Sequence, residues 1–263
     1  MVSQALEQIK NNIFGCGRGN PATGEAAGRV YHRLMISVVI PTLNSAARLP
    51  GALAALVPAA ISGLISELVI ADAGSTDLTL PIADEVGANI VSATARTRGA
   101  RLSAAAGAAK GRWLMFLSAD TVLEPNWERE VETFMLRATR SGGRTAAAFS
   151  FALDDPAPAA RRSEFWVRRR AWLFGLPHAD QGLLVNRSFY DEIGGFKPID
   201  TLAEVDLLRR IGKERIAILK SAAITSAERF RTHNLVMRGV RDIVALTGYS
   251  LRIPPQLLAR LCG

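Results

Sequence analysis

The clearest pattern in the chain is an alternation of apolar runs and amphipathic stretches that begins at Met35. Four runs are rich in apolar residues and short enough for strands: MISVVI (35–40), SELVIADAG (66–74), GANIVSA (87–93) and RWLMFLSAD (112–120). Continuous apolar runs of this kind are typical of strands that are buried on both faces of a parallel sheet. Pro41 is expected to stop the first of these strands.

Stretches with helical spacing fill the gaps between the predicted strands. Apolar residues recur at helical intervals in ARLPGALAALVPAA (47–60), a second helix is expected from about Leu78 to Val86, and RGARLSAAAGAAKG (98–111) indicates a small-residue helix closed by Gly111. This alternation predicts an α/β fold, a mostly parallel sheet flanked by helices and joined by right-handed crossovers. In such sheets, ligands bind at the carboxyl ends of the strands.

The two ends of the chain carry weaker patterns. Residues 1–34 are expected to form a loosely ordered extension, and one hypothesis is that Met35 is the native start. The C-terminal tail, 232–263, mixes basic and apolar residues and packs either on the domain or on a membrane. Cys16 and Cys262 lack the spacing of a disulfide framework or a zinc site. No run is long enough for a membrane span and no signal peptide is evident, so a cytoplasmic protein is expected.

The charge of the chain points to anionic partners. The formal net charge is +8 and the sequence pI is about 10.2. Nucleotides, phosphorylated lipids and an acidic membrane surface all fit this charge. Zinc-finger spacing, RNP-like aromatic pairs and leucine heptads are lacking, so nucleic acid is not expected as a partner.

Polar residues follow three of the four predicted strands: Pro41–Asn44, Asp72–Asp77 and Ser118–Asp120. In this order and spacing, the strings VVIPTLN, VIADAGSTDLT and FLSAD resemble the nucleotide-binding half of GT-A glycosyltransferases, in particular glycosyltransferase family 2. The resemblance runs from about Met35 to Arg231. It implies a GT-A-like (Rossmann-like) fold with a nucleotide-sugar-binding half over 35–135 and an acceptor half over 136–231.

A second block strengthens the resemblance. GLPHADQGLLVNRSFYDEIGGF (175–196), followed by IDTLAEVDLLRRI (199–211), is similar to the acceptor half of a bacterial branch of that family. In that branch a Gly-Asp-Gln-Gly-like segment precedes an apolar strand, a Gly-Gly-Phe turn and an acidic pair that opens a helix. The resemblance therefore implies that Asp180 and Gln181 contact the acceptor.

The resemblance also assigns residues to a nucleotide-sugar donor. Asp120 is the expected ligand of a divalent cation, magnesium or manganese, because a hard cation neutralises the charge that develops on a leaving diphosphate. Asp72 is expected against the donor base. Pro41, Thr42 and Asn44 are expected to line the same pocket. Among Arg96, Arg98 and Arg101, Arg101 is the preferred contact of the diphosphate.

An inverting transfer needs a carboxylate that takes the proton of the acceptor hydroxyl while an oxocarbenium-like centre is attacked. In the resembling family, the position of Glu204 is that of the base. Asp206, two residues further, is the second candidate for this role. The implied acceptor is unknown, with a lipid-linked or cell-envelope glycan as the candidate class.

The chain departs from the family pattern in two places. Many members carry Asp-x-Asp after the fourth strand, whereas Ser118 stands at the first acidic position here. A single carboxylate, Asp120, is then left for the cation. The base position holds Glu204 where Asp is more usual, which changes its reach by about one methylene group.

Structural roles stand beside the functional ones for most of these residues. Asp72 to Asp77 would suit a turn with a helix cap, and Asp120 would cap the following turn. The acidic pair Glu204 and Asp206 suits the first turn of a helix. Asp180 and Gln181 would serve as structural hydrogen-bonding groups, and His178 is assigned no role.

The segment from Ala159 to Leu176 interleaves arginines with Phe165, Trp166, Trp172 and Phe174. Two interpretations stay open. One is a helix with a buried aromatic face and a solvated basic face. The other is a cationic amphipathic helix that lies peripherally on anionic lipid headgroups.

Two other functions are alternatives to a glycosyltransferase. A nucleotidylyltransferase would carry a Gly-rich basic loop after the first strand, and IPTLNSAARLP lacks it. A P-loop or dinucleotide site is excluded because GxxxxGK[ST] and GxGxxG are absent. A non-catalytic nucleotide- or membrane-binding module on a degenerate GT-A fold remains the alternative, favoured by Ser118.

Overall fold

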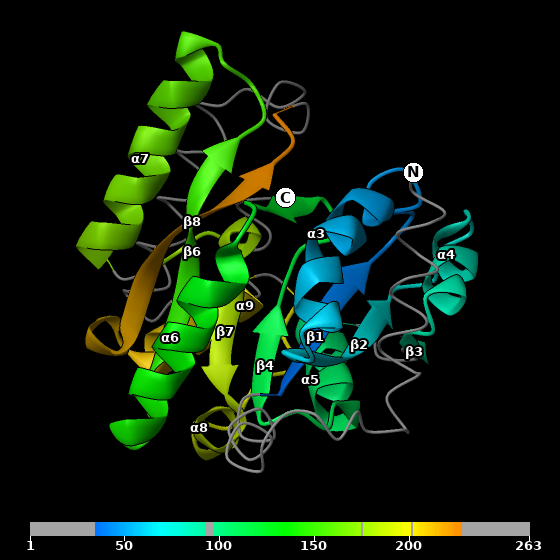
Figure 1. Cartoon of the computed structure of the whole chain (residues 1–263), viewed down its shortest axis with the longest axis horizontal. Coiled ribbons are helices and arrows are strands. Elements are labelled where there is room, and N and C mark those ends of the chain that lie inside the picture. The colour runs from blue at the N-terminus through cyan, green and yellow to red at the C-terminus, as the bar shows by residue number, and fades with distance from the viewer. Residues whose placement is uncertain (1–34, 93–96, 175, 201, 228–263) are drawn as a thin grey trace.

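A computed structural model of the chain describes residues 35–92, 97–174, 176–200 and 202–227 (Figure 1). The predicted extension 1–34, the tail 232–263, both cysteines and Arg96 lie outside the described residues. The described residues form one eight-stranded sheet in the order β3-β2-β1-β4-β7-β6-β8-β5. Helices pack on both faces of it.

The strands range from three to ten residues. In chain order they are β1 (Ile36–Thr42), β2 (Ile65–Asp72), β3 (Asn89–Ser92), β4 (Trp113–Phe116), β5 (Thr121–Leu123), β6 (Ala146–Leu153), β7 (Leu183–Asn186) and β8 (Ile216–Thr225).

The α-helices and two short 3-10 helices follow or separate these strands. They are α3 (Leu49–Ile61), α4 (Thr79–Glu85), α5 (Arg98–Ala108), α6 (Trp127–Arg140), α7 (Pro158–Phe174), η1 (Ala179–Gln181), α8 (Arg187–Glu192), α9 (Ala203–Ile211) and η2 (Lys213–Arg215).

The first four predicted strands are confirmed as a parallel half-sheet. β1 lies at its centre and pairs in parallel with β2 on one side and β4 on the other, while β3 extends the sheet beyond β2. The remaining strands join through antiparallel pairing of β7 with β4, and β6 and β8 pair in parallel with each other. The mixed α/β sheet therefore matches the predicted fold class, with a mostly parallel arrangement.

The expectation that Pro41 stops the first strand is wrong, because β1 continues to Thr42. The carbonyl of Val39 accepts a hydrogen bond from the backbone N–H of Leu117, which follows β4. Pro41, two residues further, directs its nitrogen to that same side. Pairing with β4 ends at Val39, so the missing N–H of proline leaves no ladder bond unmade.

The core consists of two main clusters on opposite faces of the sheet. Val38 and Ile40 of β1 point into the cluster built with α3, α4 and α6, whereas Val39 points into the cluster built with α5, α8 and α9. Figure 1 shows α3 and α6 in front of the sheet. Because helices cover both faces of the sheet, the sequences of these strands are continuous apolar runs.

The expected closure of the third helix by Gly111 is also wrong. Helix α5 ends at Ala108, and Ala109 is already extended. Gly111 instead packs on β1, where a Cβ atom would stand 2.6 Å from the backbone nitrogen of Ser37. The glycine is needed there for close approach of two backbones, and not for a helix cap.

None of the helices in the described ranges has both the length and the hydropathy to cross a membrane. The longest, α7, carries five arginines and one glutamate among its 17 residues.

Candidate active site

A cleft of about 460 Å³ opens at the carboxyl ends of the parallel strands. One wall is the end of β1 with the loop that follows it, from Pro41 to Ser45, and the floor includes Ser118, Ala119 and Asp120 between β4 and β5. The opposite wall is formed by the first turn of α5, by η1 and by Glu204 at the start of α9. This is the edge of the sheet where ligands of α/β proteins bind.

The loops after β1 and β2 brace each other along this wall. The backbone N–H of Asn44 donates to Ser75 Oγ (2.9 Å), and Asn44 Oδ1 accepts from the backbone N–H of Thr76 (2.9 Å). Asn44 has a φ of 48°, in the left-handed region that asparagine tolerates better than most residues. The backbone N–H of Ala46 donates to Asp77 (3.0 Å). The two strand-end motifs are therefore one structural unit.

Asp72 lies behind the cleft wall. Its side chain is buried, and its carboxylate accepts hydrogen bonds from Thr42 Oγ1 (2.7 Å), Ser75 Oγ (2.6 Å) and the backbone N–H groups of Gly74 and Ser75 (both 2.8 Å). Burial opposes the charged form, but the hydrogen bonds from Ser75, Thr42 and Gly74 outweigh it and hold the pKa of Asp72 below its ordinary value. In this arrangement Asp72 braces the turn and does not line the cleft, unlike Thr42.

Asp120 is on the floor of the cleft, beside the residue that replaces the other family carboxylate. Ser118 Oγ donates a hydrogen bond to Asp120 Oδ1 at 2.6 Å. Both residues line the cleft. Ser118 therefore orients the carboxylate of Asp120, and this position contributes to the site without carrying charge.

Glu204 lines the cleft from the first turn of α9. Arg98 Nε donates to Glu204 Oε1 at 2.7 Å, and the two side chains are 38% and 22% exposed. The backbone N–H of Arg98 also donates to Asp200 (3.0 Å). A Cβ atom on Gly99 would stand 2.0 Å from the carbonyl oxygen of Lys197, so glycine permits α5 to approach the segment before α9. This close packing brings Glu204 to the cleft.

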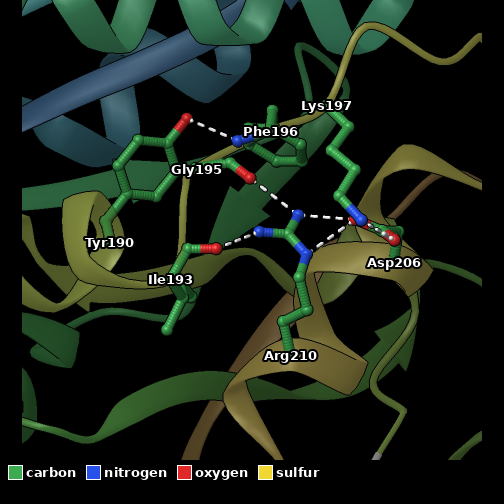
Figure 2. Close-up of polar contacts among 7 residues, drawn as sticks. All are labelled: Tyr190, Ile193, Gly195, Phe196, Lys197, Asp206 and Arg210. Carbon is green, nitrogen blue, oxygen red and sulfur yellow. Dashed lines mark hydrogen bonds and ion pairs between the residues drawn. The ribbon is translucent and has the colours of Figure 1, made fainter.

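Asp206 lies two residues further along α9 and lines no cavity described at this site. Figure 2 shows its carboxylate between Lys197 and Arg210. Arg210 donates to Asp206 Oδ2 from Nη2 (2.5 Å) and Nε (2.8 Å), and Lys197 Nζ lies 3.3 Å from Oδ1. Arg210 also donates to the carbonyl groups of Ile193 and Gly195. Asp206 therefore orients Arg210, and Arg210 stabilises the Gly-Gly-Phe turn at residues 194–196.

The same turn is fixed from its other side by Tyr190. Its hydroxyl accepts a hydrogen bond from the backbone N–H of Phe196 (3.0 Å), as Figure 2 shows. Burial raises the pKa of Tyr190 above its ordinary value. Gly195 has a φ of 53°, and a Cβ atom there would stand 2.8 Å from the ring of Tyr190. This explains the glycine at that position.

The two predicted acceptor residues are separated by the structure. Asp180 lines the cleft, whereas Gln181 is buried and donates from Nε2 to the carbonyl of Phe149 (2.7 Å). Gln181 Oε1 accepts from the backbone N–H of His178 (2.7 Å). Gln181 therefore shapes η1, and Asp180 is the member of the pair that a ligand can reach.

Further residues line the cleft that were not assigned to the site from the sequence. His178, predicted to have no role, lies there, with Nδ1 3.2 Å from Asp180 Oδ2. Arg48 and Arg98 line the cleft together with the predicted Arg101. Their only signal in the sequence is basic character near a strand end. The three guanidinium groups form a cationic lining suited to an anionic ligand.

A smaller apolar pocket of about 30 Å³ adjoins the cleft. It shares Pro41, Arg98 and Glu204 with the larger cleft. Its other walls include side chains from α5, β4 and α9, namely Leu102, Phe116 and Leu208. The carboxylate of Glu204 therefore stands where a polar, cationic cleft meets an apolar recess.

The fold and the cleft together define a GT-A-type glycosyltransferase, with its ligand site at the carboxyl edge of a parallel half-sheet. Residues 37–197 match the sequence model of glycosyl transferase family 2, which is more than half of the chain. The chain therefore belongs to glycosyl transferase family 2, as the strand-end motifs predict.

Curated relatives that match the chain are named PGL/p-HBAD biosynthesis glycosyltransferases, from Mycobacterium tuberculosis and Mycobacterium bovis. They are 37% identical over 95 residues. The match covers 34% of this chain and 36% of theirs, so the chain spans about a third of the length of these relatives.

Solved structures match over most of the chain. Mannosyltransferase PcManGT from Pyrobaculum calidifontis, in complex with GDP-Man and Mn²⁺, has a TM-score of 0.63 at 15% identity and covers 96% of this chain and 76% of its own. Glucosyl-3-phosphoglycerate synthase from Mycobacterium tuberculosis, with Mn²⁺, UDP and glucosyl-3-phosphoglycerate, has a TM-score of 0.60 at 21% identity and covers 90% and 87%. These similarities confirm the GT-A fold.

The family implies a divalent cation, and the cleft residues fit one. Among the residues that the structure describes, no group of three or more His, Cys, Asp or Glu side chains could hold an ion unaided. Magnesium and similar cations commonly bind through one or two carboxylates together with substrate phosphates. Asp120, oriented by Ser118, supplies such a carboxylate at the cleft, and the imidazole of His178 lines the same space.

Proposed function

We propose that this chain transfers a sugar from a nucleotide-sugar donor to an acceptor hydroxyl, with inversion at the sugar carbon. The observation that carries the proposal is that Asp120, Glu204 and three arginines line one cleft at the carboxyl edge of the sheet. Structural neighbours with the same fold are complexed with GDP-Man and Mn²⁺ or with UDP-glucose and Mn²⁺, which supports a nucleotide-sugar and a divalent cation here.

The donor is proposed to lie along the loop after β1, with Pro41, Thr42 and Asn44 against the nucleotide. Asp72 acts from behind this loop by holding Thr42 and the Gly74–Ser75 turn, on which the base rests. Arg101 and Arg48 lie toward the diphosphate. Asp120 and His178 are the residues that would hold magnesium or manganese. When bound, the cation neutralises charge on the leaving diphosphate.

Glu204 is proposed as the base that accepts the proton of the acceptor hydroxyl. It stands at the boundary between the charged cleft and the apolar pocket, so an acceptor can reach it without displacing the donor. Its carboxylate is held by Arg98 at 2.7 Å. We propose that Arg98 turns toward the donor diphosphate when the donor binds, which leaves Glu204 oriented toward the acceptor. Asp206 is not part of this proposal, because its carboxylate is committed to Arg210 and Lys197.

The acceptor is proposed to enter past η1, where Asp180 lines the cleft. Gln181 contributes by fixing η1 and not by direct contact. A lipid-linked or cell-envelope glycan is the proposed acceptor class. The names of the mycobacterial relatives, which refer to PGL/p-HBAD biosynthesis, agree with an acceptor of this kind.

Calorimetric titration with UDP, GDP and CDP, and with their common sugar conjugates, tests the donor part of the proposal. We expect one nucleotide to bind tightly only when manganese is present, and expect Asp120→Asn to lose that dependence. Asp84→Asn on the exposed side of α4 is the matched control and should bind as the wild type does. Absence of binding for every nucleotide under every metal condition would instead support a non-catalytic module.

Turnover and stereochemistry test the remaining part. With the donor class known from calorimetry, the anomeric configuration of the product can be read from proton NMR coupling constants. A product of opposite configuration to the donor supports direct displacement assisted by Glu204. A retained configuration would refute the inverting mechanism while leaving donor binding intact.

A further inference from the structure

The described side chains of helix α7 lie on two distinct faces, and among them the inner face is polar, unlike the buried aromatic face of one of the two interpretations. The inner face carries Ala160, Glu164 and Arg168. Glu164 is buried, accepts from the backbone N–H of Leu153 (2.8 Å) and pairs with Arg161 (2.8 Å). Arg168 donates from Nε and Nη2 to the carbonyl of Phe151 (3.2 and 3.1 Å). Polar contacts to β6 therefore attach the helix to the sheet.

The outer face carries Phe165 and Trp166. Arg162, Phe165, Trp166 and Arg169 follow the spacing of one helical stripe, and all four are exposed. Phe165 is 56% exposed and Trp166 is 68% exposed. Their rings pack edge to face at 6.0 Å, and the guanidinium of Arg169 lies 6.0 Å from the ring centre of Phe165. We call these four residues the outer stripe.

The outer stripe has no structural explanation within the described residues. Large aromatic side chains are normally buried in a core or an interface, where removal of their surface from water is favourable. Phe165 and Trp166 lack this stabilisation when they are exposed to water. Negative charge is also absent from the stripe, because the single glutamate of α7 faces inward and is paired with Arg161. A binding surface with apolar and cationic character remains.

We propose that the outer stripe docks this protein on an anionic lipid bilayer. A helix lying in the membrane interface places aromatic rings at the level of the headgroups and keeps basic residues beside lipid phosphates. Trp166 and Phe165 would enter the headgroup layer, while Arg162 and Arg169 pair with the phosphates on either side. A second copy of the chain fits less well, because a symmetric contact would set the same arginines against each other.

The position of α7 connects this surface with the cleft. Figure 1 shows α7 at one end of the molecule, with α4 and β3 at the opposite end. Helix α7 ends at Phe174, and His178, a few residues further, already lines the cleft. A docked α7 would therefore keep the η1 wall of the cleft near the bilayer. The docking itself does not depend on the proposed transferase activity.

Vesicle co-sedimentation with the full chain tests the docking surface. We expect binding to vesicles of phosphatidylcholine with phosphatidylglycerol, little binding to phosphatidylcholine alone, and weaker binding at high salt. Arg162→Gln/Arg169→Gln removes two basic charges and should lower the partition coefficient roughly thirtyfold. Phe165→Ser/Trp166→Ser should lower it roughly tenfold or more, since the rings no longer leave water.

A charge-matched control separates the stripe from the general positive charge. Arg112→Gln/Arg137→Gln removes two exposed arginines outside α7 and should reduce binding far less. The proposal is overturned if the wild type does not bind anionic vesicles, or if the control variant loses as much binding as the stripe variants. It is equally overturned if the aromatic double variant still binds fully. If that variant instead converts a wild-type dimer to a monomer in sedimentation velocity, and no vesicle binding occurs, the stripe is a self-association surface.

Discussion

Four carboxylates from the family-like motifs of this protein form two pairs with different environments. Asp120 and Glu204 line the cleft, whereas Asp72 and Asp206 lie beside it and do not line it. We call the first pair the cleft acids and the second pair the bracing acids. The sharpest contrast is on α9, where Glu204 keeps 22% of its side chain exposed and Asp206, two residues further, keeps 6%.

The difference lies in the donors that surround each carboxylate. Asp72 accepts three hydrogen bonds from the turn that it closes and one from Thr42 of β1, and Asp206 forms ion pairs with Arg210 and Lys197. Such saturated carboxylates stabilise local structure and offer little to a ligand. Successive helical residues are about 100° apart, so a step of two turns the side chain to another side of the helix. Cleft acids should therefore affect function, and bracing acids should affect stability.

The largest expected effect separates Glu204 from all other acids. Glu204→Gln keeps the shape of the side chain but cannot accept a proton, and loss of a general base costs about 10²- to 10⁴-fold in rate. We expect kcat to fall by roughly a thousandfold while donor affinity, measured by calorimetry, is unchanged. Glu85→Gln, exposed on α4, is the control. If Glu204→Gln kept the turnover of the wild type, Glu204 would not be the general base.

Asp206→Asn should show the opposite behaviour. The change removes the buried carboxylate that pairs with Arg210, and breaking a buried pair costs about 3 kcal/mol. Lys197 is 54% exposed, so the loss of its contact adds little. We expect urea unfolding to reveal this loss, while turnover per folded molecule stays close to that of the wild type. The exposed neighbour Asp191→Asn should leave both quantities unchanged. A stable but inactive Asp206→Asn protein would mean that the two acids of α9 have been assigned the wrong way round.

Asp120→Asn sharpens the contrast at the cleft floor. We expect manganese-dependent donor affinity to fall by at least about tenfold, because the cation loses its charged ligand. The urea midpoint should hardly change, in contrast to Asp206→Asn. Ser118→Ala provides the graded comparison, with a smaller loss of affinity because it removes only the hydrogen bond that orients Asp120. Metal-independent binding that is the same in all three proteins would exclude Asp120 as a ligand.

The smallest expected effect is a pH dependence from Asp72. Its pKa lies below the ordinary value of 3.8, so its charged form is more stable in the folded protein than in the unfolded chain. This contribution is present above pH 3.8 and is lost as the pH falls from there through the folded pKa. We expect urea midpoints of the wild type and Asp72→Asn to differ above pH 3.8 and to converge in stronger acid. A difference that is constant with pH would contradict this role.

Much of the parallel half-sheet could be predicted from the sequence, because burial on both faces leaves a continuous apolar run. The four strand predictions agree with β1 to β4, and the first helix agrees with α3. The errors fall where neighbours override local preference. Pro41 continues β1 because β4 has already ended on that side, and Gly111 serves a close backbone contact with Ser37. Neither partner could be identified from local pattern.

The candidate site was only partly predictable for the same reason. The residue types at three strand ends and the acidic start of a helix indicated chemistry, and the family assignment follows from them. The sequence could not show that Gln181 turns inward to Phe149, or that Arg98 and His178 reach the cleft. Helix α7 forms where a helix was expected, but the aromatic side chains described on it, Phe165 and Trp166, lie on the outer face.

The sequence by itself determined the class of fold, the family and the edge of the sheet that holds the site, because periodicity and motif spacing are local properties. Only the tertiary structure decided which of two neighbouring carboxylates lines the cleft, Glu204, and which one is held beside it by Arg210 and Lys197, Asp206. That choice depends on packing between segments about a hundred residues apart, such as Gly99 against Lys197. A carboxylate becomes a site residue or a brace according to the donors that the fold brings to it.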